Sequence, residues 1–189
     1  MADESIEALI REGYQARFEH RPADAAALFT RAVELCRAAG QALLLARALT
    51  GLGQIERDLG NTATAAGHYE EAIAIQRTAS SPLTLAHTVR HLGDIRRHRG
   101  ELKVADACYE ESLAIYRKQS ETPPLDLANA IRGYALLKAA AGNNRDSVRL
   151  WQEAGALYES LGIEAGVAES KAQLAQLSAQ RGQSSVPHP

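Results

Sequence analysis

Two histidines and an aspartate recur on one segment at spacings that could bind a metal ion. The segment HTVRHLGDIRRHRG begins at His87 and holds four arginines, in a chain whose formal net charge is only −2. Residues four apart share a face of a helix, so His87, His91 and Asp94 are geometrically able to ligate a cation such as Zn²⁺. The nearby Arg90 and Arg97 would repel a dication, which favours other uses of the segment.

Two such uses follow from the helical spacing of the same segment. Ala86, Val89 and Leu92 define one side of the predicted helix, so the histidines, including His98, are expected to face away from the local core. There they would either line a groove for a protein partner or form a solvated helix face. Because neighbouring arginines disfavour imidazolium, we expect this face to gain charge mainly below about pH 6.

Composition favours a helical protein without bulk nucleic-acid binding. Only 5% of the 189 residues are aromatic, and the near-even charge count differs from the strongly basic balance of nucleic-acid-binding domains. No stretch approaches the roughly 20 apolar residues of a membrane span, and the acidic start MADESIEAL lacks the features of a secretory leader. We therefore expect a cytoplasmic protein that has neither nucleic acid nor membrane as its partner.

The elements that position this segment belong to a repeat of forty residues. Glycines recur at that interval at Gly13, Gly53, Gly93 and Gly133. An aromatic residue follows each of the first three glycines by sixteen positions, at Phe29, Tyr69 and Tyr109. Apolar residues at i, i+3, i+4 and i+7 predict two helices in each repeat. A mid-helix glycine lowers helix propensity, so we expect it to admit the aromatic ring of the second helix into the core.

These motifs resemble the tetratricopeptide repeat, whose pattern combines a Leu-Gly pair, a glycine between the helices, and an alanine–aromatic–alanine series. The matching residues are Leu52, Gly53, Gly60, Ala65, Tyr69 and Ala72, and again Leu92, Gly93, Gly100, Ala105 and Tyr109. The period of forty is similar to the long-helix variant of kinesin light chain-like repeats. The resemblance implies an all-α fold: an α-solenoid of antiparallel helix pairs in a right-handed superhelix, with about nine helices.

The repeats divide the chain into a single predicted array over residues 1–182, followed by a disordered tail over residues 183–189. The predicted repeats cover residues 3–40, 41–80, 81–121 and 122–162, with a capping helix over residues 163–182.

The resemblance also implies that the first helix of each pair lines a concave groove. The groove residues expected on this basis are Arg11, Tyr14, Arg17, Arg47, Gln54, Arg57, His87, Arg90, His91, Asp94, Arg97 and His98. Cations outnumber anions among them, whereas the second helices hold acidic runs such as HYEEA and CYEES. A basic groove would attract an acidic peptide or helix.

A protein-interaction scaffold is the function that these features favour. The chain has no phosphate loop, nucleophile elbow or metalloprotease motif, so we expect neither an enzyme nor a cofactor. A carboxylate clamp of the co-chaperone type is also not expected, because its positions fall on residues such as Ile10, Gly51 and His87. The alternatives are a ligand- or peptide-responsive regulator, a metal-binding module and a self-associating module. We expect a monomer.

Overall fold

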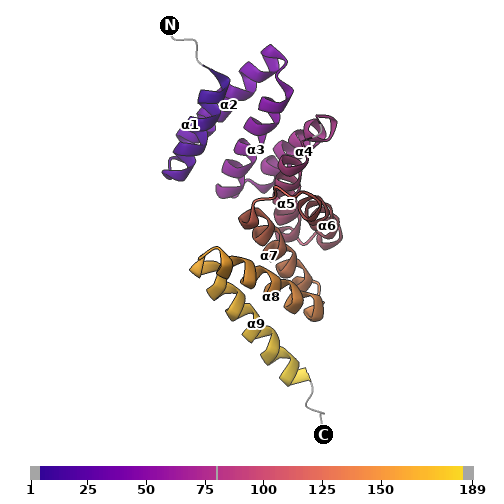
Figure 1. Ribbon diagram of the computed structural model, residues 1–189. Coiled ribbons are helices and arrows are strands. Elements are labelled where there is room, and N and C mark those ends of the chain that lie inside the picture. Colours follow the sequence, from indigo (N-terminus) through magenta and orange to yellow (C-terminus); the bar gives the residue numbers. More distant parts are fainter. Residues whose placement is uncertain (1–4, 80, 185–189) are drawn as a thin grey trace. The chain divides into compact units, whose positions relative to one another are not determined.

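The computed structural model describes residues 5–79 and 81–184 of the chain, with side chains up to residue 180. Across these residues the chain forms nine helices and no strand, which confirms the predicted all-α fold (Figure 1). The helices are α1 (Ile6–Phe18), α2 (Pro22–Ala39), α3 (Ala42–Asp58), α4 (Thr62–Thr78), α5 (Pro82–His98), α6 (Leu102–Lys118), α7 (Pro124–Ala140), α8 (Asn144–Ser160) and α9 (Glu164–Ser184).

The helix lengths and ends follow from the repeat. Each of the six helices α3–α8 has 17 residues, as expected for the long-helix variant. Gly60 and Gly100 stand after α3 and α5 with φ angles of 86° and 75°, in the left-handed region that ends helices and favours glycine. Pro82 and Pro124 are the first residues of α5 and α7, where a missing backbone N–H is tolerated.

The residues that precede the second helices α4 and α8 differ in how they cap them. Asn143 caps α8, since its side chain accepts a hydrogen bond from the backbone N–H of Asp146 at 3.2 Å. Asn61 occupies the equivalent position before α4 without a side-chain cap bond. Its amide instead donates to Glu56 at 2.8 Å. The same residue type at the same repeat position thus caps one helix and not the other.

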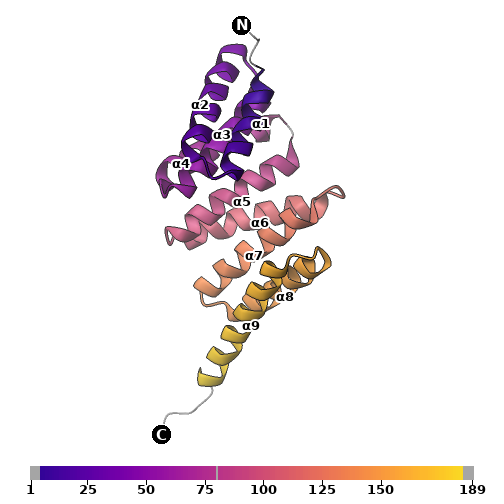
Figure 2. The same ribbon diagram turned by 90° about the vertical axis from the view of Figure 1, so that its left-hand side faces the viewer.

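The helices fall into two compact units, one ending at Ile95 and the other beginning at Arg96. In the first unit α1 packs against α2 and α3, and α3 packs against both α2 and α4 (Figure 1). In the second unit α6, α7, α8 and α9 pack in succession (Figure 2). The single array over residues 1–182 stays a prediction. Helix α9 continues to residue 184, and the rest of the predicted tail lies outside the described residues.

The mid-helix glycines admit aromatic rings, as predicted. A Cβ atom added to Gly53 would lie 2.5 Å from the ring of Tyr69, and one added to Gly13 would lie 2.9 Å from the ring of Phe29. Tyr69, Phe29 and Trp151 are fully buried. The glycines therefore let bulky aromatic side chains fill the space between paired helices.

None of the described helices combines the length and the apolar character that a membrane crossing requires.

Candidate functional site

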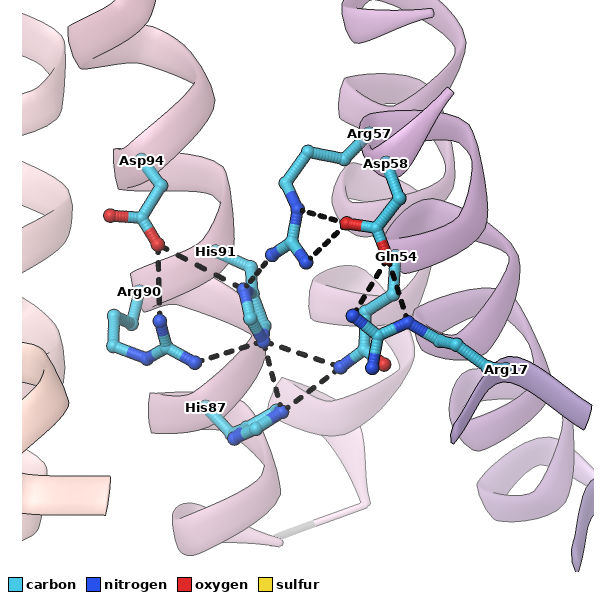
Figure 3. Close-up of polar contacts among 8 residues, drawn as sticks. All are labelled: Arg17, Gln54, Arg57, Asp58, His87, Arg90, His91 and Asp94. Carbon is cyan, nitrogen blue, oxygen red and sulfur yellow. Dashed lines mark hydrogen bonds and ion pairs between the residues drawn. The ribbon is translucent and has the colours of Figure 1, made fainter. Parts of the chain in front are cut away.

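The first helices of the first unit bring eight polar side chains together, and we call this group the polar cluster (Figure 3). Its members are Arg17 of α1, Gln54, Arg57 and Asp58 of α3, and His87, Arg90, His91 and Asp94 of α5. Residues three or four apart lie on one side of a helix, which explains why α3 and α5 each contribute several. All eight belong to the unit that ends at Ile95.

Asp58 joins α1 to α3 at one edge of the cluster. Its carboxylate accepts from Arg17 Nε at 2.9 Å and from Arg57 Nη2 at 2.8 Å. Burial raises the pKa of the Asp58 carboxyl, but the hydrogen bonds from these two arginines outweigh burial and lower the pKa below its usual value. Asp58 is therefore a charged anchor for both guanidinium groups.

His91 lies at the centre of the cluster. The structure corrects the expectation that this side chain faces away from the core. It is buried, with 6% of its surface exposed, and its ring stacks on Tyr69 of α4 at a centroid distance of 5.6 Å. The helical wheel misplaced this residue because α5 is covered on a second side, where α3 provides hydrogen-bonding partners. Gln54, also expected in the open groove, is buried to the same degree.

Arginines and a histidine surround the His91 ring. Arg57 Nη1 lies 2.8 Å from Nδ1, Arg90 Nη2 lies 2.9 Å from Nε2, and His87 Nε2 lies 3.1 Å from Nε2 (Figure 3). Burial, followed by the positive charge of Arg90, lowers the pKa of His91 well below its usual range. This shift disfavours the imidazolium form of His91 and so opposes the expectation that this face gains charge below about pH 6.

The cluster carries a surplus of positive charge. Arg90 forms an ion pair with Asp94 at 3.0 Å, and Asp58 pairs with the other two arginines. Three arginines thus face two aspartates, which leaves one positive charge when the histidines are counted as neutral. The guanidinium of Arg57 stays within reach of solvent, since 25% of its side chain is exposed, against 11% for Arg90.

The remaining predicted groove residues lie outside this cluster. Tyr14 of α1 is partly buried against Phe29, and Arg47 of α3 is exposed with its guanidinium carbon 5.9 Å from the centroid of the Tyr14 ring. Arg11 is exposed on α1. Arg97 and His98 belong to the second unit, where their side chains contact each other at 3.0 Å.

Two features of the site were missed by sequence reasoning. Tyr69 was predicted only as a core residue, but its ring also supports His91. Thr50 of α3 and Thr88 of α5 form a buried hydrogen bond at 3.2 Å beside the cluster. A signal for the second feature was present, since the two threonines are 38 residues apart, close to one repeat.

The cluster does not assemble the ligand set of a metal site. In the part of the chain that the structure describes, no group of three His, Cys, Asp or Glu side chains is placed to hold a metal ion. The nitrogens of His91 face guanidinium groups instead. The guanidinium groups donate hydrogen bonds and carry positive charge, so they favour binding of an anion and disfavour binding of a cation.

Known structures share this fold. BtubC (BKLC) from P. vanneervenii aligns with 100% of this chain and 70% of its own, at 20% identity and a TM-score of 0.69. A variant of the putative kinesin light chain TPR-like repeats of Podosopora anserina aligns with 94% of this chain and 87% of its own, at 17% identity and a TM-score of 0.74. RapI in its apo form gives a TM-score of 0.81 at 14% identity, over 90% of this chain and 62% of its own.

The family comparison agrees with the glycine spacing. No curated protein shows significant sequence similarity to the chain. The family model described as tetratricopeptide repeat matches residues 4–78, which include α1 to α4. Residues 4–78 therefore resemble tetratricopeptide repeats, and the described helices beyond them share the fold of the solved structures named above.

Proposed function

We propose that this protein is an interaction scaffold whose first helices bind an acidic peptide or helix of a protein partner. Tetratricopeptide repeats generally mediate protein–protein interaction, which supports a binding role over a catalytic one. The observation that carries the proposal is the convergence of Arg17, Arg57 and Arg90 from three first helices, with only two aspartates among them.

Charge on the second helices supports the same assignment. Arg37 of α2 forms an ion pair with Glu71 of α4 at 2.8 Å, and Arg117 of α6 pairs with Glu153 of α8 at 2.8 Å. Glu71 and Glu153 are thus matched by arginines of neighbouring second helices, whereas the polar cluster keeps its surplus. Anionic partners are attracted to such a local surplus and are steered toward it as they approach.

Direct binding of two labelled peptides tests the proposal. One peptide carries six glutamates and the other carries six lysines in the same positions. We expect the glutamate peptide to bind with a Kd in the micromolar range, which corresponds to about −8 kcal/mol. Its affinity should fall as the NaCl concentration is raised. The lysine peptide is expected not to bind. Equal binding of both peptides, or affinity that is insensitive to salt, would contradict an electrostatic role for the first helices.

A matched pair of charge reversals locates the binding surface. Arg47→Glu reverses an exposed charge on the first helix α3, and Arg31→Glu makes the same change on the second helix α2. We expect Arg47→Glu to lower the affinity for the glutamate peptide, because this change lies on the proposed binding face. Arg31→Glu is expected to keep the affinity within about twofold of the wild-type value. The reverse order would place the partner on the second helices.

A further inference from the structure

His91 faces two donors that it cannot satisfy together. A neutral imidazole has one nitrogen that accepts a hydrogen bond and one that carries a hydrogen, whereas a guanidinium only donates. Arg57 Nη1 approaches Nδ1 at 2.8 Å, and Arg90 Nη2 approaches Nε2 at 2.9 Å. Whichever nitrogen carries the hydrogen, one of the two arginines therefore directs an N–H at another N–H.

Neither protonation nor a flipped amide removes this conflict. An imidazolium would have hydrogens on both nitrogens and would add a positive charge between two guanidinium groups. The Gln54 amide could be turned so that its oxygen faces the ring, but its contacts are with Nε2 of His87 and His91, at 3.3 Å each. It does not meet either guanidinium, so it supplies neither arginine with an acceptor.

Acceptors are scarce in the rest of this region as well. Arg57 and Arg90 share the two carboxylates of the cluster with Arg17, and the buried Nε of Arg90 has no hydrogen-bond acceptor. The buried hydroxyl of Tyr69, whose ring stacks on His91, has none either. Buried polar groups are usually satisfied, so a shared deficit at neighbouring residues points to an acceptor that a ligand provides.

We propose that a carboxylate of the acidic partner binds at Arg57, beside His91, and accepts the guanidinium hydrogen bond that His91 cannot. This inference rests on the proposed function and assigns its anchoring contact. Arg57 is the capturing residue because its side chain is more exposed than that of Arg90. With Arg57 turned to the ligand, Arg90 is the one arginine that donates to the ring, at Nε2, and the ring hydrogen resides on Nδ1.

Three neutralising variants test the site, with the labelled six-glutamate peptide as the probe. We expect Arg57→Gln to lower the affinity at least about tenfold, as loss of a charge-assisted hydrogen bond does. Arg47→Gln removes the same charge from the exposed part of the same helix, and a smaller loss of about threefold is expected. Arg31→Gln on α2 is the matched control for net charge and leaves the affinity unchanged.

The outcomes separate this inference from the proposed function. If the peptide binds the wild-type protein and Arg57→Gln lowers the affinity no more than Arg47→Gln does, binding at the basic surface is supported and the Arg57 site is refuted. If the peptide does not bind the wild-type protein, the proposed function falls as well. Tighter competition by inorganic phosphate than by glutarate would replace the carboxylate with a phosphate group as the ligand and overturn the proposal.

A measurement on the wild-type protein keeps the test independent of folding in the variants. Nitrogen-15 spectra of histidine-labelled protein report which nitrogen of each ring carries the hydrogen. At saturating six-glutamate peptide we expect His91 to be neutral with its hydrogen on Nδ1. Ring signals of His91 that do not change during a titration in which the peptide binds, or a bound ring with its hydrogen on Nε2, would overturn the proposal.

Discussion

At the scale of single residues, His91 shows how burial changes the role of a side chain. Its type and spacing suggest a surface residue, but it is buried against Tyr69 and meets guanidinium groups on both ring nitrogens. In that position a neutral His91 accepts a hydrogen bond from one arginine, Arg57 or Arg90.

Gly53 provides a test of residue-scale packing. An alanine Cβ at this position would lie 2.5 Å from the ring of Tyr69, which is fully buried and lies under His91, so the ring has little room to move. We expect Gly53→Ala to lower the free energy of unfolding by about 1–3 kcal/mol, measured by urea denaturation.

Gly67 is the matched control for that substitution. It lies inside α4, and an added Cβ would have no neighbour within 4 Å. Since alanine favours a helix interior over glycine, Gly67→Ala is expected to raise the free energy of unfolding by about 0.5–1 kcal/mol. Loss of stability in both variants would mean that close approach to Tyr69 is not what requires glycine at position 53.

At the scale of elements, each helix is defined by its ends as much as by its apolar face. The second helices α4 and α8 begin after an asparagine at equivalent repeat positions, but only Asn143 makes a side-chain cap bond. The side-chain amide of Asn61 donates to Glu56 near the end of α3, whereas the amide of Asn143 donates to Asp146 within the helix that Asn143 caps.

Alanine at the two asparagines tests this difference. We expect Asn143→Ala to lower the free energy of unfolding by about 1 kcal/mol, because it leaves the backbone N–H of Asp146 without its cap. Asn61→Ala is expected to change stability by less than about 0.5 kcal/mol, because it removes only an exposed side-chain contact. Urea denaturation of both variants measures the comparison, and equal losses would refute it.

At the scale of the whole molecule, His91 makes stability depend on pH. Below about pH 6.5 the unfolded chain binds a proton at this histidine, whereas burial and then the charge of Arg90 lower the pKa in the folded chain and exclude the proton. The unfolded state then binds more protons, so the free energy of unfolding falls as the pH falls. The full contribution is present above about pH 6.5, and up to about 1.4 kcal/mol is lost for each pH unit below it.

Urea denaturation at pH 7.5 and pH 5.0 measures this dependence. We expect His91→Gln to show a smaller loss of stability between the two pH values than the wild-type protein. His20→Gln changes an exposed residue between α1 and α2 and is expected to keep the wild-type loss. Asp58 does not confuse the comparison, since a carboxylate with a lowered pKa loses its stabilising contribution only as the pH falls below about 4. If the free energy of unfolding of His91→Gln fell between the two pH values by as much as that of the wild-type protein, His91 would not be the group that titrates.

The sequence by itself determined the helices, their length and the aromatic residues of the core. Glycines at an interval of forty and apolar residues with helical periodicity are properties of the chain that need no knowledge of its contacts. The resemblance to the tetratricopeptide repeat implied that Arg57, His87, Arg90 and Asp94 share one surface of the first helices, and the structure brings these four into one cluster.

Only the tertiary structure decided which of these side chains are buried and which nitrogen faces which donor. A helical wheel describes one buried side, but α5 receives Tyr69 from α4 and hydrogen-bonding side chains from α3, so His91 and Gln54 are enclosed. The hydrogen bonds between helices of this cluster join residues 33 to 41 positions apart, such as Gln54 with His87 and Arg17 with Asp58. Their geometry depends on how the helices pack, and that packing is not a property of any one helix.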